Sequence, residues 1–296
     1  MALGTGHFLC RVFGSGFILS LTRFLRILLS PRVPLWVEPM PAPAKGLPRT
    51  SREGAAAIYF PSCISRTMGE LPGEPDGLSV AEAFVAVAAR AGSSLHIPDG
   101  VRGRCCGVPY SSKGFGEAHH LAVNDTVAWL WTSSDEGKLP VVVDTSPCVF
   151  GLRSPEGLSR ENRERLSRMR ILDGVEFFTG LLPHLTVKRR AGAVALHPVC
   201  SLVKMDLTGK LEALARACAD VVTVPSSAGC CGFAGDRGWL FPELTASAMK
   251  EEAAEITASG ATECASSSRT CEVAVARATD LVTRSFIHLL EHGTRE

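Results

Sequence analysis

The chain contains the stretch Gly103-Arg104-Cys105-Cys106-Gly107, and a second Cys-Cys-Gly triplet follows at Cys230-Cys231-Gly232. Each pair of adjacent cysteines is flanked by one cysteine upstream and one downstream. The flanking residues are Cys63 and Cys148 for the first pair and Cys200 and Cys271 for the second. Such self-similarity indicates an internal duplication. We therefore expect two copies of one cysteine-lined unit.

The spacing of the two sets of cysteines is similar. In the first set 41 residues separate Cys63 from Cys105 and 41 separate Cys106 from Cys148, and the matching intervals of the second set are 29 and 39 residues. Three loops would thus bring four thiols together in each unit. Thiolates are soft ligands that suit iron–sulfur clusters and zinc, so each set is a candidate metal or cluster site.

Composition excludes several classes of protein. The chain has 296 residues, of which 46% are apolar and 21% charged, and this balance is typical of about two globular domains. The net charge of +1 gives no sign of a nucleic-acid-binding surface. Eleven cysteines could form disulfides, but disulfide-rich chains are usually small and secreted. Metal or redox use is the better interpretation.

Three cysteines fall outside the repeated pattern. Cys218 lies on the apolar face of an expected helix and is predicted to be a core residue. Cys264 has no counterpart in the first half, and a core position or a place beside the site is expected for it. Cys10 belongs to the N-terminal helix.

The N-terminal region is predicted to lie outside the two units. Residues 1–30 are expected to form an amphipathic helix, and the longest charge-free run, 12–22, is too short to cross a bilayer. Without a signal peptide the chain is predicted to be cytoplasmic. We expect residues 7–30 to pack on protein, with peripheral contact with the inner face of the membrane as the alternative. Residues 31–54 hold six prolines and are expected to form an extended linker.

The rest of the chain alternates between strand-like and helix-like segments. This order predicts an α/β fold with two pseudo-repeated small units, 55–187 and 188–296, each with a parallel sheet, flanking helices and cysteine-lined loops. A Ser79-to-Glu82 capping box marks the start of one helix. The expected strands are 55–60, 94–98, 139–143, 193–196, 220–224 and 261–265, and the expected helices are 80–91, 116–133, 159–170, 172–185, 207–218, 242–258 and 280–291.

Three further residues are candidates for the surroundings of the second site. His197 ends a strand three residues before Cys200, so it could hydrogen-bond a cluster sulfur or move a proton. Asp236 and Arg237 follow the second triplet, where the alternative is a purely loop-shaping role. A zinc site in either half and plain buried thiols also remain open.

The longer strings YFPSC, CCGVPYSSKG, HPVCS, CCGFAGDRG and SSSRTCE resemble a known family. The paired Cys-Cys-Gly units are similar to the CCG, or cysteine-rich, domains found in heterodisulfide reductase and in the glycolate oxidase iron–sulfur subunit. Over about residues 40–292 the chain resembles the C-terminal iron–sulfur part of bacterial FAD-linked D-lactate or D-2-hydroxyacid dehydrogenases.

This resemblance implies an oxidoreductase component that binds one or two iron–sulfur clusters of the 4Fe-4S type. The implied ligands are Cys63, Cys105, Cys106, Cys148, Cys200, Cys230, Cys231 and Cys271. Electrons would come from FAD on a flavoprotein partner and leave to a quinone or cytochrome acceptor. The alternatives are a thiol–disulfide site of the heterodisulfide reductase type and a zinc-stabilised binding module. Several relatives have a fifth thiol per unit, whereas this chain has Thr145 and Ser268 at those positions.

Overall fold

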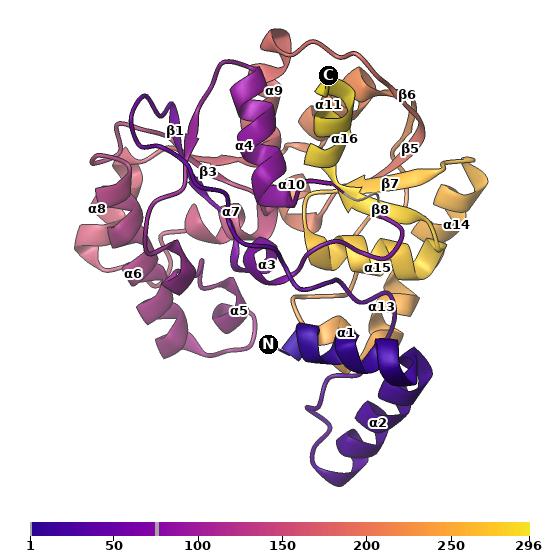
Figure 1. Cartoon of the computed structure of the whole chain (residues 1–296). Coiled ribbons are helices and arrows are strands. Elements are labelled where there is room, and N and C mark those ends of the chain that lie inside the picture. The colour runs from indigo at the N-terminus through magenta and orange to yellow at the C-terminus, as the bar shows by residue number, and fades with distance from the viewer. Residues whose placement is uncertain (1, 75–76) are drawn as a thin grey trace.

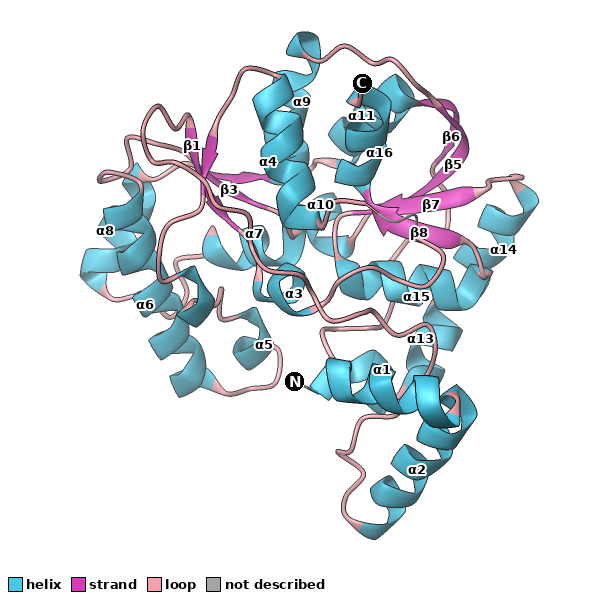
Figure 2. Cartoon of the chain, in the orientation of Figure 1, coloured by secondary structure: helices cyan, strands magenta, loops and turns pink. Residues whose placement is uncertain are grey.

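A computed structural model describes residues 2–74 and 77–296. Within these ranges the chain forms two four-stranded sheets whose strand pairs are all parallel (Figures 1 and 2). The strand orders are β2-β1-β3-β4 and β6-β5-β7-β8, so the second sheet repeats the topology of the first. The predicted fold class of two pseudo-repeated α/β units is confirmed.

The first sheet is formed by β1 (Ala57–Phe60), β2 (Leu95–His96), β3 (Val141–Val143) and β4 (Ile171–Asp173). The helices of this half are α3 (Cys63–Thr67), α4 (Val80–Arg90), η1 (Val101–Gly103), α5 (Val108–Ser111), α6 (Gly116–Ser133), α7 (Ser146–Leu152), α8 (Arg160–Arg168), α9 (Gly174–Leu181) and η2 (Leu182–His184). The side chains of β1 and β3 are buried throughout, as expected for inner strands of a parallel sheet covered on both faces. The capping box at the start of α4 forms as predicted.

The second sheet is formed by β5 (Ala191–His197), β6 (Ala219–Thr223), β7 (Glu263–Ser266) and β8 (Val282–Ser285). Its helices are α10 (Cys200–Lys204), α11 (Thr208–Cys218), α12 (Arg237–Leu240), α13 (Pro242–Ala248), α14 (Lys250–Ala258), α15 (Arg269–Thr279) and α16 (Phe286–Thr294). The helix expected over 242–258 is thus two helices, α13 and α14.

The fourth strand of each sheet was missed by the sequence prediction. We expected helices over 172–185 and 280–291, but β4 and β8 lie at the start of these segments and α9 and α16 follow at once. Each strand has three or four residues and leads directly into an amphipathic helix, so the helical period dominates the pattern.

The two units share a continuous core. Helices α4 and α9 of the first unit and α11 and α16 of the second lie between the two sheets (Figure 2). Phe84 of α4 packs edge-on against Phe178 of α9 and Phe286 of α16, with ring centroids 5.0 and 6.0 Å apart. The units are therefore joined by apolar packing rather than by a flexible connection.

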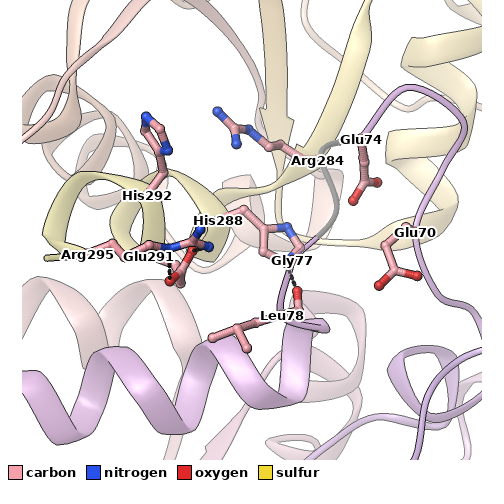
Figure 3. A pocket seen from close by; sticks show the side chains of 9 residues that line it. All are labelled: Glu70, Glu74, Gly77, Leu78, Arg284, His288, Glu291, His292 and Arg295. Carbon is pink, nitrogen blue, oxygen red and sulfur yellow. Dashed lines mark hydrogen bonds and ion pairs between the residues drawn. The ribbon is translucent and has the colours of Figure 1, made fainter.

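Charged residues of both units line a pocket beside this core (Figure 3). Its lining includes Glu70 and Glu74 of the first unit and Arg284, His288 and Glu291 of the second. His288 bonds the Leu78 carbonyl oxygen at 3.1 Å. The lining among the described residues includes no cysteine, so neither cysteine site lies in this pocket.

The N-terminal region corrects two expectations. The expected single helix is two helices, α1 (Ala2–Phe13) and α2 (Ser15–Leu28), which meet at Gly14 with a φ of 84°. The proline-rich segment is extended but is no free linker, because Trp36 and Met40 are buried and Arg277 bonds the Val37 carbonyl oxygen at 2.9 Å. The described residues contain no helix that combines the length and apolar character needed to cross a bilayer.

Candidate metal centres

The first cysteine site consists of Cys63, Cys105, Cys106 and Cys148. Cys63 follows β1 as the first residue of α3, Cys148 follows β3 as the third residue of α7, and the adjacent pair lies in the loop between η1 and α5. The sulfur atoms of Cys106 and Cys148 are 3.1 Å apart and buried. Cys105 interacts with both Cys63 and Cys106. The structure thus brings all four predicted thiols together.

The second cysteine site consists of Cys200, Cys230, Cys231 and Cys271 and is built in the same way. Cys200 follows β5 as the first residue of α10, and Cys271 follows β7 as the third residue of α15. The sulfur atoms of the buried pair Cys231 and Cys271 are 3.2 Å apart. Cys200 and Cys230 are hydrogen-bonded to each other and exposed. Each site therefore has a buried inner pair and a more accessible outer pair.

The strand order explains why the thiols meet. In both sheets the chain reverses its direction of winding between the two central strands, β1 and β3 or β5 and β7. The crevice beyond the carboxyl ends of such neighbouring strands is the place where open parallel sheets bind ligands. The flanking cysteines follow these two strands, and the Cys-Cys-Gly loops close the crevice.

A glycine permits each Cys-Cys-Gly loop to turn. Gly107 has a φ of 82°, and a Cβ atom there would lie 2.6 Å from Nδ1 of His119. Gly232 has a φ of 70°, and its Cβ would lie 3.1 Å from the Leu244 carbonyl oxygen. Both positions combine a left-handed backbone with close packing, which explains the third residue of the triplet.

The thiols share protons within each site. Hydrogen bonds from Cys106 and Cys63 lower the pKa of Cys105 to about 2. A hydrogen bond from Cys200 lowers the pKa of Cys230 to about 6, and one from Cys271 lowers the pKa of Cys231 to about 5. These interactions favour the thiolate form of Cys105, Cys230 and Cys231, and the thiolate is the form of cysteine that binds metals.

The comparison with protein families supports this interpretation for the second unit. Residues 194–276 match the family model described as the CCG cysteine-rich domain. The match lies within the second unit and includes Cys200, Cys230, Cys231 and Cys271. No curated protein matches the chain. The first unit has the strand order and the cysteine placement of this cysteine-rich domain.

The second unit has a buried histidine, His197, at the end of β5, where the first unit has Phe60 at the end of β1. Nδ1 of His197 lies 2.7 Å from Oε1 of Glu252, and the two side chains are 0% and 2% exposed. A ring nitrogen of His197 and the sulfur atoms of Cys231 and Cys271 lie within 4.8 Å of one another. Burial would lower the pKa of His197, but the nearby Cys231 and Glu252 raise it to about 9. This His–Cys–Cys group could hold a metal ion.

Asp236 and Arg237 form no hydrogen bond with a cysteine sulfur among the described residues. The Asp236 carboxylate pairs with Nζ of Lys113 at 2.6 Å and so ties the loop after one Cys-Cys-Gly to the loop after the other. Arg237 opens α12, and no side-chain hydrogen bond joins it to another residue in the described ranges. Asp236 therefore connects the two units.

The three remaining cysteines belong to neither set of four thiols. Cys218 and Cys264 are buried in the shared core, as expected. Cys10 is half-buried in α1.

Sequence reasoning missed the polar groups that support the sites. Oγ of Ser146 lies 2.8 Å from Oγ of Ser267, and this contact joins the loop before Cys148 to the loop before Cys271. Arg66 donates to the carbonyl oxygens of Val101 and Arg104, both at 2.6 Å, and so fixes the loop before Cys105. These contacts span 35 or more residues, and no local sequence signal marks them.

Proposed function

We propose that the chain is an iron–sulfur electron-transfer module with one centre at each cysteine site. The observation that carries this proposal is the pair of four-thiol sites, each formed at the crevice of a parallel sheet with two of its thiols buried. Thiolate sets of this kind bind clusters that accept and donate single electrons. Burial of the inner pair and hydrogen bonds around the outer pair would tune the potential.

The parent system that fits best is a flavin-dependent D-lactate or D-2-hydroxyacid dehydrogenase. The strings around the cysteines resemble the iron–sulfur part of such enzymes. Electrons would enter from FAD on a flavoprotein partner and leave to a quinone or cytochrome acceptor. The contact of Ser146 with Ser267 supports transfer between the centres, because it joins the start of the helix that carries Cys148 to the segment that leads into the helix with Cys271.

Two alternatives have a specific observation in their favour. Cys200 and Cys230 are exposed, which would suit attack on a disulfide substrate by a heterodisulfide reductase-like site. The His–Cys–Cys group of the second unit would suit zinc in one half. The exposed thiols are equally compatible with an electron exit, so electron transfer remains the first proposal.

The test is anaerobic purification followed by analysis of iron, sulfide and zinc, and then mixing with a lactate-reduced flavoprotein. We expect the visible absorption of the oxidised clusters to bleach with no disulfide reductase activity. Disulfide reduction by the isolated chain would favour the heterodisulfide alternative. Zinc without iron would overturn both redox functions.

We also propose that α1 and α2 bind the protein peripherally to the surface of an anionic membrane. Phe17, Phe24 and Leu28 form an apolar stripe on α2 with exposed fractions of 51%, 61% and 64%, and Phe13 packs on Phe17 at 5.1 Å. Residues 2–37 contain no acidic side chain. Exposed apolar side chains in a basic segment are typical of helices that lie in the interface of anionic bilayers.

A further inference from the structure

One ring nitrogen of His197 is bonded to a carboxylate, and the other has no nitrogen or oxygen partner among the described residues. Nδ1 lies 2.7 Å from the Glu252 carboxylate. Nε2 is buried without a nitrogen or oxygen partner in the described part of the chain, and the ring interacts with the thiol of Cys231. A buried polar atom without a nitrogen or oxygen partner costs free energy, so the place of Nε2 requires an explanation.

The sulfur atoms of the inner pair supply that explanation. Cys231 and Cys271 lie within 4.8 Å of the ring, and all three side chains are buried. A histidine that donates one N–H to a carboxylate and presents its other nitrogen to thiolates has the arrangement of a metal-ligating histidine, in which the carboxylate fixes the tautomer and the ring orientation.

The first unit provides an internal comparison. Phe60 ends β1 and precedes Pro61 and Cys63 in the way that His197 ends β5 and precedes Pro198 and Cys200. The ring centroids of Phe60 and Trp129 are 5.9 Å apart, so the first unit folds with an apolar side chain at this position. The buried pair of His197 and Glu252 is therefore not required to build the unit, and burying such a pair carries a desolvation cost.

We propose that Nε2 of His197 is a direct ligand of the second centre, together with Cys231, Cys271 and one outer thiolate. Glu252 acts as a positioning residue that keeps the Nδ1 proton and aims Nε2 at the metal. The first centre is bound by thiolates alone. This inference rests on the proposed function, because it requires a metal centre in the second unit.

The mixed ligand set gives the two centres different potentials. A neutral imidazole in place of a thiolate makes a centre less negative, and histidine ligation raises the reduction potential of iron–sulfur clusters. Electrons would then pass from the first centre to the second. The second centre, with exposed Cys200 and Cys230 beside it, would be the exit.

The test uses the double variant Cys106→Ser/Cys148→Ser. It removes the inner thiols of the first site, so that a cluster signal comes from the second site. In this background we expect pulsed electron paramagnetic resonance of the reduced cluster to show a strong coupling to histidine nitrogen. His197→Gln, which can still donate to Glu252, should lose this coupling. His197→Cys should retain the iron but have a lower midpoint potential.

Glu252→Gln tests the positioning role. The amide cannot hold the Nδ1 proton as a carboxylate does, so the nitrogen coupling should weaken while iron is retained. If the second unit binds zinc instead, X-ray absorption at the zinc edge should show one nitrogen and three sulfur neighbours, with the nitrogen lost in His197→Gln.

The possible failures can be told apart. A metal in the second unit with no nitrogen ligand, or a coupling that survives both His197 variants, would overturn this inference and leave the proposed function intact. A second unit that binds no metal would overturn both.

Discussion

At the residue scale, Asp173 is a buried carboxyl group at the junction of β4 and α9. Its Oδ1 accepts the Val175 N–H at 2.9 Å, and its Oδ2 is buried with no hydrogen-bond partner among the described residues. Burial raises the pKa of Asp173 to about 6, although Ser146 and the Val175 N–H counteract part of this effect. The protonated form is therefore favoured by folding.

This shift predicts a pH dependence of stability. A group whose pKa is higher in the folded state contributes stability below its unfolded pKa, near 3.8, and this contribution is lost as the pH rises through about 6. The difference corresponds to about 3 kcal/mol at most. Asp173→Asn keeps the cap acceptor but cannot ionise, so the variant should gain stability relative to the native chain between about pH 4 and pH 7.

This effect is measured by the urea unfolding midpoints of the native chain and of Asp173→Asn at about pH 4 and about pH 7. Asp206→Asn is the matched control, because Asp206 is exposed and its φ of 56° is one that asparagine tolerates. The difference in urea midpoint between Asp206→Asn and the native chain should be the same at both pH values. Parallel pH curves for the native chain and Asp173→Asn would contradict the account of this residue.

Some residues of the two cysteine sites could be predicted from the sequence, and others could not. All eight thiols could be predicted from the sequence, because the two copies of the Cys…Cys-Cys-Gly…Cys pattern can be aligned with each other. His197 could be singled out by its place before Cys200. Its partner Glu252 could not, because it lies 55 residues away on a helix whose acidic residues otherwise look like a solvated face.

At the element scale, the duplicated strand–loop–helix units were predictable and their shortest strands were not. β1, β3 and β5 are apolar runs between turn residues, which is a strong strand signal. β4 and β8 become strands through pairing with β3 and β7, and a window centred on them is dominated by α9 and α16. Tertiary pairing overrides local pattern at both places.

Helix α2 is the element on which the membrane proposal depends. Replacing Phe17, Phe24 and Leu28 by serine should abolish co-sedimentation with vesicles of phosphatidylcholine and phosphatidylglycerol, because it removes the apolar stripe. Arg11→Gln/Arg23→Gln should weaken binding about tenfold at low salt, since each basic side chain near an anionic surface contributes attraction.

Leu121→Ser is the matched control for the stripe. Leu121 is 74% exposed on α6, far along the chain from α2, and its replacement should leave vesicle binding unchanged. Native protein that stays in the supernatant would refute the membrane contact. A stripe variant that loses flavoprotein binding while vesicles bind neither protein would assign the stripe to a protein partner.

At the scale of the whole molecule, the two units are packed against each other, and each carries one of the two cysteine sites. The core helices α4, α9, α11 and α16 are shared, and Arg269 of the second unit forms a buried ion pair with Glu74 of the first. Ser146 and Ser267 join the segments that lead into the helices with Cys148 and Cys271. The sequence predicts two similar units but not this junction, because residues at the junction are contributed by segments 121 or more positions apart.

The central claim is that each unit holds its own cluster. The most direct measurement is the iron and sulfide content of the anaerobically purified chain and of two double variants, Cys106→Ser/Cys148→Ser and Cys231→Ser/Cys271→Ser. Two four-iron clusters predict about eight iron per native chain and about four in each variant. Cys10→Ser, which lies outside both sites, should match the native chain. Native protein that contains zinc alone or no metal, or a variant pair that leaves the iron content unchanged, would contradict the claim.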